Sequence, residues 1–156
     1  MTAAVIVSLR VAASPLRAFE AFTEEIGAWW TPNPLFMLTP SGDGRLAFEP
    51  GEGGRLFTRL DDGSEFEIGR ITVWQPGERL ALGWRQASFA ADQSTHVDVR
   101  FEAIGDETRV TVEHRGWDSI PQADAARHGF PLMVFQQRQV EHWRTLLASL
   151  KAAVQA

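Results

Sequence analysis

The sequence contains no cysteine and no tyrosine, and lysine occurs once, at Lys151. The absence of cysteine excludes disulfide bonds, thiolate metal sites and cysteine nucleophiles. The absence of tyrosine removes the phenol as a proton donor and leaves six tryptophans and ten phenylalanines to supply the aromatic bulk. The reactive chemistry open to this chain is therefore narrow, while its means of building an aromatic core are ample.

Clustered positive charge and long apolar runs are also missing. The net charge of −5 argues against a nucleic-acid-binding surface, because phosphates are met by grouped Lys and Arg. No stretch approaches the about 20 apolar residues of a membrane-spanning helix, and residues 1–10 lack the basic and apolar segments of a signal peptide. We therefore expect a cytoplasmic protein with neither a nucleic-acid nor a membrane partner.

The first thirty residues predict one strand followed by two short helices. Ala4–Val11 alternates with β-branched residues on one side, as a half-buried strand does. Ser14-Pro15 is a helix start, with Ser as the N-cap and Pro at the first helical position. Thr23 is expected to cap a second short helix that runs into Trp29-Trp30.

The middle of the chain, residues 44–117, predicts a meander of antiparallel strands. Gly, Asp and Pro mark the turns between them, and strands so close in sequence are expected to pair as neighbours. The expected strands are Arg45–Glu49, Gly54–Leu60, Glu65–Trp74, Arg79–Arg85, Thr95–Ala103 and Thr108–Trp117.

In the last two of these strands, apolar and charged residues alternate, and this alternation predicts which face of each strand is buried. One face carries Val97, Val99 and Phe101 on the first strand, and Val110, Val112 and His114 on the second. The opposite face carries charged residues, among them Asp98, Glu102 and Arg109, which we interpret as a solvated outer surface. His114 therefore shares the face that is expected to point into the core.

Residues Leu132 to Val154 predict a long amphipathic helix, because their apolar side chains recur at spacings of three and four. The stripe comprises Leu132, Phe135, Gln139, Trp143, Leu147, Leu150 and Val154, and Val140 and Leu146 widen it. No repeat or linker divides the chain. The pattern predicts one α+β domain over residues 1–156, a curved antiparallel sheet wrapped around this helix.

The same pieces follow one another, over nearly the whole chain, as they do in the START-like superfamily. They are Ser14-Pro15 with Phe19 and Phe22; Trp29-Trp30 with Pro32; Gly53-Gly54; Gly69-Arg70-Ile71; Pro76, Leu80, Leu82 and Trp84; Thr108–Val112 with His114; and Trp143, Leu147 and Leu150. Within the superfamily the chain resembles the branch named for the activator of the heat-shock-ninety ATPase. The resemblance implies the helix-grip fold, with about six or seven strands, two short helices after the first strand and a long C-terminal helix.

The resemblance also implies a cavity between sheet and helix, so a small-molecule binding domain is our first functional hypothesis. We expect a hydrophobic or aromatic ligand, with no catalysis, no cofactor and no metal. The candidate ligand-binding residues are Trp30, Phe57, Trp84, Val99, Phe101, Val112, His114, Phe135, Gln139 and Trp143. A lid is expected at Trp30–Met37 or at Asp118–Phe130.

His114 and Gln139 are the polar members of that set. His114 would either be a general acid or base or a donor to a ligand carbonyl, or be a core histidine satisfied by a backbone group or water. Gln139 would either orient a ligand or reach solvent. Arg55 and Arg59 flank Phe57 and would favour an anionic ligand if that side faced the cavity. We favour the surface for both, because burying unpaired guanidiniums costs several kcal/mol. Glu65 and Glu67 are likewise interpreted as a solvated strand face.

Two alternatives stay open at this point. A protein-interaction or co-chaperone-type regulator, the role that the family's name implies, would have a filled core and an exposed apolar patch, with Phe36, Met37 and Phe89 as its residues. A cyclase- or hydrolase-like enzyme would use His114 as its acid or base. The sequence is compatible with a monomer and with a homodimer.

Overall fold

The structure, a computed structural model, describes residues 4–31, 33, 36, 38, 45–86, 89–90 and 92–155. Pro32 and Met37, on which parts of the resemblance and of the expected lid and patch depend, lie outside these residues. The helices and strands are β1 (Ala4–Val11), α1 (Pro15–Thr23), α2 (Ile26–Trp29), β2 (Arg45–Phe48), β3 (Arg55–Arg59), β4 (Glu65–Gln75), β5 (Arg79–Trp84), β6 (Thr95–Ile104), β7 (Glu107–Arg115), η1 (Trp117–Ser119), η2 (Ala125–Arg127) and α3 (Leu132–Val154).

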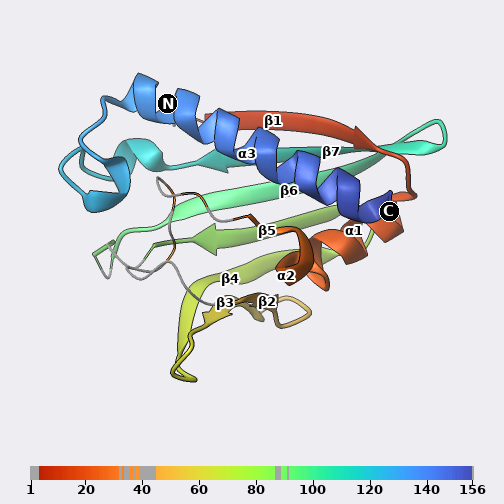
Figure 1. The fold of residues 1–156 in the computed structure, drawn as a ribbon, viewed down its shortest axis with the longest axis horizontal. Coiled ribbons are helices and arrows are strands. Elements are labelled where there is room, and N and C mark those ends of the chain that lie inside the picture. Colours follow the sequence, from red (N-terminus) through yellow and green to blue (C-terminus); the bar gives the residue numbers. More distant parts are fainter. Residues whose placement is uncertain are drawn as a thin grey trace.

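The strands form one seven-stranded antiparallel sheet in the order β1-β7-β6-β5-β4-β3-β2. Six of the strands form a meander in chain order, in which each strand lies next to the one before it. The first strand lies beside the last, so β1 and β2 are the two edges. The helix-grip architecture predicted from the sequence is confirmed, and Figure 1 shows α3 crossing one face of the sheet.

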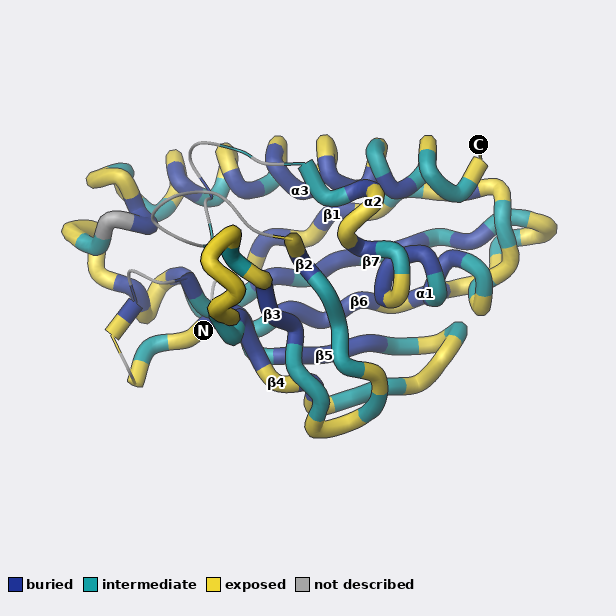
Figure 2. Tube along the Cα trace, turned by 60° about the horizontal axis from the view of Figure 1, so that its bottom comes forward, coloured by how far each residue is buried: buried dark blue, intermediate teal, exposed yellow. Residues whose placement is uncertain are grey.

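The core lies between this face of the sheet and the helices, and Figure 2 shows buried residues along both the strands and α3. Ring contacts tie the helices to the sheet: the centroids of Phe19 and Phe101 are 5.3 Å apart, and those of Phe22 and Phe101 are 6.0 Å apart. A second, smaller cluster lies at the N-terminal end of α3. It comprises Phe36, Phe89, Trp117, Ile120, Ala126 and Phe135, with Phe130 and Leu132 packed against it.

The start of α1 is confirmed, but the start of α2 is not. The backbone N–H of Arg17 donates to the Ser14 hydroxyl oxygen at 3.1 Å, with Pro15 in the first helical turn. Thr23, expected to cap α2, is instead the last residue of α1, and its hydroxyl donates to the Phe19 carbonyl at 2.8 Å. A buried threonine that bonds back by one turn satisfies its hydroxyl inside the helix, so α1 continues to this residue.

In the last hairpin Glu102 lies opposite Arg109, so both are on the outer face, as the alternation predicts. The expectation that Asp98 is solvated is wrong, because this residue is only 4% exposed. The Arg79 guanidinium covers it, with Nε at 3.2 and 3.1 Å from the two carboxylate oxygens and a terminal nitrogen at 2.5 Å from one of them. An ion pair across two neighbouring strands therefore buries the carboxylate on the outer face.

Candidate ligand-binding site

His114 lies fully buried near the end of β7, inside a chain of hydrogen bonds that uses both of its ring nitrogens. Nδ1 lies 3.2 Å from Trp143 Nε1 and 3.2 Å from Gln139 Nε2, both on α3. Nε2 lies 2.7 Å from the hydroxyl of Thr95 on β6. The long helix and two strands thus meet at this imidazole.

The partners determine which nitrogen carries the proton. An indole N–H can only donate, so Nδ1 must accept from Trp143, and the proton of the neutral ring is on Nε2. Nε2–H then donates to Thr95, whose own hydroxyl donates to the Trp84 carbonyl at 2.8 Å. The amide of Gln139 must likewise present its NH₂ group to Nδ1, which turns its oxygen away from the histidine.

Burial lowers the pKa of His114 to about 3, and the nearby His142 and His96 act in the same direction. The ring is therefore neutral at physiological pH, with its lone pair and its proton both engaged by the protein. An acid or base must exchange a proton with a substrate, and neither nitrogen is available for that exchange. The arrangement is that of a core histidine, but side chains, rather than the expected backbone group or water, are its partners.

Aromatic side chains surround this network. The Trp84 ring lies 5.8 Å from His114, 5.7 Å from Trp30 and 5.9 Å from Trp143, measured between centroids. His142 stacks on Phe36 at 4.7 Å, and burial lowers its pKa to about 4. These rings lie between the sheet and the N-terminal half of α3.

The empty space that the described residues leave between these rings is small. It measures about 10 Å³ and is lined by Trp30, Phe36, Leu38, Trp84, Gln86, Gln139, His142 and Trp143. Such a volume holds about one water molecule. Among the described residues, aromatic side chains thus lie where the resemblance implies a cavity.

One polar residue that borders this space, Gln139, has a side-chain oxygen without a hydrogen-bond partner among the described residues. Its side chain is 3% exposed, and its Oε1 has no hydrogen-bond partner among the residues that the structure describes. Buried polar atoms in proteins nearly always have a partner, because a missing hydrogen bond costs about 1–3 kcal/mol. Gln139 therefore presents an acceptor to whatever enters beside it.

The other residues predicted to bind a ligand are spread along the sheet. Val99 and Val112 lie opposite each other in the middle of the core. Phe101 packs against Phe19 and Phe22, at the α1 end of the sheet. Phe135 belongs to the second cluster, where its ring lies 4.7 Å from that of Trp117.

Phe57 is not brought to this cluster. Leu56 and Thr58 are the inward residues of β3, at 0% and 3% exposure, so Phe57 lies on the outer side with Arg55 and Arg59. The Arg55 guanidinium carbon lies 4.7 Å from the centre of the Phe57 ring. The ring also borders a surface hollow between β2 and β3 of about 310 Å³.

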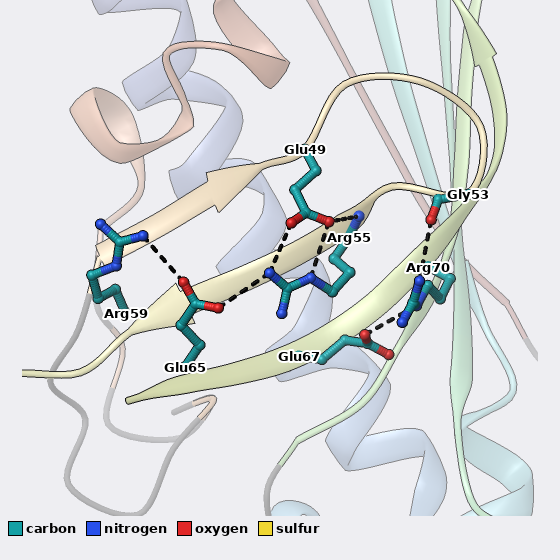
Figure 3. Close-up of polar contacts among 7 residues, drawn as sticks. All are labelled: Glu49, Gly53, Arg55, Arg59, Glu65, Glu67 and Arg70. Atoms are coloured by element: carbon teal, nitrogen blue, oxygen red, sulfur yellow. Dashed lines mark hydrogen bonds and ion pairs between the residues drawn. The ribbon is translucent and has the colours of Figure 1, made fainter. Parts of the chain in front are cut away.

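Arg55 and Arg59, the two arginines beside Phe57, are paired with carboxylates, and Figure 3 shows these pairs. Arg55 lies 2.8 Å from Glu49 and 3.1 Å from Glu65, and Arg59 lies 3.1 Å from the other oxygen of Glu65. These pairs lower the pKa of both carboxyls through hydrogen bonds from the guanidiniums. The prediction that Arg55 and Arg59 are surface residues is confirmed.

Sequence reasoning missed three buried polar residues of this region, His142, Trp117 and Arg127. His142 follows Gln139 by three residues and is 5% exposed, so it extends the buried stripe of α3, and helical spacing could have identified it. Trp117 was expected as the end of the last strand, whereas it lies in η1, beyond the end of β7 at Arg115. Arg127 carries no sequence signal, because its burial comes from the folding of the segment between β7 and α3.

Neither a metal site nor a membrane-spanning helix is found in the part of the chain that the structure describes. Those residues contain no group of three or more His, Asp or Glu side chains arranged to hold a metal ion. Nor does any helix there have the length and apolarity needed to cross a membrane.

The model of the family described as Activator of Hsp90 ATPase homolog 1-like protein (AHSA1) matches residues 12–155. The chain belongs to the AHSA1-like family. This match covers the two short helices, six of the seven strands and α3, which are the elements that build the ring cluster around His114. No curated protein matches the sequence of this AHSA1-like domain.

Solved structures share the fold of the AHSA1-like domain at low sequence identity. An Aha1 from Colwellia psychrerythraea, described as a dimer, is 18% identical, with 97% of this chain and 96% of that chain covered and a TM-score of 0.64. An HSP90 activator from Plasmodium falciparum is 16% identical, with 97% and 95% covered and a TM-score of 0.64. Protein MLL2253 from Mesorhizobium loti is 17% identical, with 96% and 95% covered and a TM-score of 0.64.

Proposed function

We propose that this AHSA1-like domain binds a small apolar or aromatic molecule between the sheet and α3, beside Gln139. The supporting observation is the buried amide oxygen of Gln139, which has no partner among the described residues and borders the space lined by aromatic rings. Burying an aromatic ligand among these rings would contribute about 25 cal/mol per Å² of apolar surface. A donor on the ligand would satisfy Gln139 and set the ligand's orientation.

An organic ligand needs more room than one water, so a side chain that borders the space must turn aside. Trp30 is the half-buried member of the ring set, whereas Trp84 and Trp143 are 5% and 1% exposed. Its ring lies 6.0 Å from both His142 and Trp143, and it follows the end of α2. We therefore assign the opening movement to Trp30, with His114 as the fixed support behind the site and no catalytic step.

The experiment is native mass spectrometry of freshly purified protein, followed by denaturing extraction of bound molecules. Wild-type protein and the control Gln137→Leu, which changes an exposed glutamine of α3, are expected to carry the same small molecule. Gln139→Leu keeps the size and apolar body of the side chain, and is expected to lose that molecule. If the molecule stays bound to Gln139→Leu, the site lies elsewhere.

A protein partner is the second candidate function, and the close filling of the interior favours it. The relatives named as Aha1 and as an HSP90 activator suggest a chaperone or a second copy of the chain as that partner. The prediction that Phe36 and Phe89 form an exposed apolar patch is wrong, because each residue is 5% exposed and packs in the second cluster. If purified protein carries no ligand and a panel of lipids and aromatics leaves its melting temperature unchanged, a pull-down for partners becomes the next experiment.

A further inference from the structure

Arg127 is the only arginine among the described residues that lies buried, at 4% exposure. Its two terminal nitrogens donate to the carbonyls of Ile120 and Phe130, both at 2.8 Å. Its guanidinium carbon lies 5.5 Å from the centre of the Phe135 ring. Its Nε has no hydrogen-bond partner within the described part of the chain.

No ion pair joins this guanidinium to a carboxylate within that part of the chain. The less buried Arg55 and Arg79 each meet an acidic side chain. Carbonyl oxygens supply dipoles but no negative charge, and a buried charge without a counter-ion costs several kcal/mol. Buried arginines are therefore almost always paired, and Arg127 departs from that rule.

A second unsatisfied donor lies against the same phenylalanine. Trp117 is 1% exposed, and its indole Nε1 has no partner among the described residues. Its ring lies 4.7 Å from Phe135 and 5.2 Å from His114. Two N–H donors, one of them on a permanent cation, thus border one aromatic ring, and the unsatisfied acceptor of Gln139 lies one helical turn further along α3.

The segment that carries Arg127 has several hydrogen bonds within itself, and its Ile120 and Ala126 pack in the second cluster. Besides the two carbonyl bonds of Arg127, the Gln122 amide donates to the Gly129 carbonyl at 2.7 Å, and the Ala126 backbone N–H donates to the Asp124 carboxylate at 2.9 Å. Ring contacts with Phe135 then hold it against α3. A unit of this kind can shift without breaking its internal bonds. This is one of the two places where the sequence predicts a lid.

We propose that the carboxylate of an aromatic acid binds to Arg127 and Trp117 beside Phe135. One carboxylate oxygen accepts from Arg127 Nε, the other accepts from Trp117 Nε1, and the aromatic body lies among the rings of the second cluster. Charge-assisted hydrogen bonds of this type are the strongest that a site without a metal offers. The inference rests on the proposed function and deepens it, because it makes the ligand an organic anion.

The experiment compares matched acids and amides, 2-naphthoate with 2-naphthamide and phenylpropionate with phenylpropionamide. Affinity is measured by calorimetry at constant ionic strength and pH 7. In the wild-type protein each acid is expected to bind at least about tenfold more tightly than its amide, since a hydrogen bond to a charged group contributes about 1.5–3 kcal/mol.

Two variants and one control test whether Arg127 and Trp117 cause the preference for acid over amide. Arg127→Met is expected to bind acid and amide equally, and Trp117→Phe, which keeps an aromatic ring but loses the N–H, is expected to weaken acid binding several-fold. Arg138→Met removes an exposed arginine of α3 that pairs with Glu141, and is expected to behave as wild type. If Arg127→Met does not fold, Trp117→Phe carries the test alone.

The results separate this inference from the proposed function. Equal binding of acid and amide by the wild-type protein would overturn the inference and leave the proposed function standing. An acid preference that survives in both Arg127→Met and Trp117→Phe would also overturn it. If neither member of any pair binds, the inference and the proposed function both fail.

Discussion

Lowering the pH from 7 to 5 is expected to destabilise the fold through His114 and His142. Burial lowers their pKa values to about 3 and about 4, from 6.5 for an unperturbed histidine. Between these values and 6.5 the unfolded chain binds protons that the folded protein excludes. The free energy of unfolding therefore falls as the pH drops below 6.5.

The size of the effect follows from the same values. A histidine that stays neutral in the folded state loses about 2 kcal/mol of stabilisation between pH 7 and pH 5, so the two together lose about 4 kcal/mol. His96, whose pKa is lowered by burial and by Arg115, adds to the loss in the same direction. The ion-paired carboxylates barely contribute in this window, since their unfolded pKa is 4.5 and their folded pKa is lower.

Urea unfolding at pH 7, 6 and 5, followed by tryptophan fluorescence, measures this loss. His142→Phe keeps a ring against Phe36 and removes one of the two titrating groups, so its loss is expected to be about 2 kcal/mol smaller than that of the wild type. His128→Asn changes an exposed histidine and serves as the control. The reasoning is refuted if the wild type loses less than about 1 kcal/mol, or if His142→Phe loses as much as the wild type.

Two paired substitutions test the sheet. Gly69→Ala would place its Cβ 1.6 Å from the Gly83 carbonyl oxygen, so we expect a loss of about 3 kcal/mol or more in the free energy of unfolding, whereas the Cβ of Gly83→Ala meets nothing within 4 Å and should change little. Similar stabilities for the two alanine variants in urea would contradict this. Asp98→Asn weakens a buried partner of Arg79 and is expected to cost about 1–3 kcal/mol in the same assay, with Glu102→Gln, on the exposed part of the same face, as the control. A loss no larger than that of the control would show that the pair contributes nothing.

The fold was predictable because its elements repeat simple periods. The alternation of Ala4–Val11 and the spacing of Leu132–Val154 coincide with β1 and α3 as the structure bounds them. Every strand of the meander was located to within one or two residues at each end, since turn residues separate them. Thr23 was misplaced because a threonine caps a helix start and also bonds back inside a helix end, and one sequence does not distinguish the two.

The outer face of the sheet was predictable only in part. Alternation correctly turned Phe57, Arg55 and Arg59 away from Leu56, but the candidate list still placed Phe57 at the site, because a phenylalanine is expected inside. The burial of Asp98 follows from the register of β5 and β6, which places Arg79 opposite Arg100 and so diagonal to Asp98 on the same face. Side-chain pairs of this kind depend on strand alignment, which local pattern does not contain.

Hydrophobic periodicity is a local property, so the sequence was enough to predict the helix-grip fold and the inward faces of its strands. It placed His114 and Trp143 on faces that point into the core, and it left open whether Gln139 reaches solvent. The packing of α3 on the sheet buries Gln139, holds His114 neutral between donors from α3 and a hydroxyl from β6, and brings aromatic rings to the space beside Gln139. The same holds for Arg127, which is buried only once the segment before α3 folds against Phe135. Hydrogen-bond satisfaction and residual volume are set by contacts between distant elements, so they are decided when the layers pack.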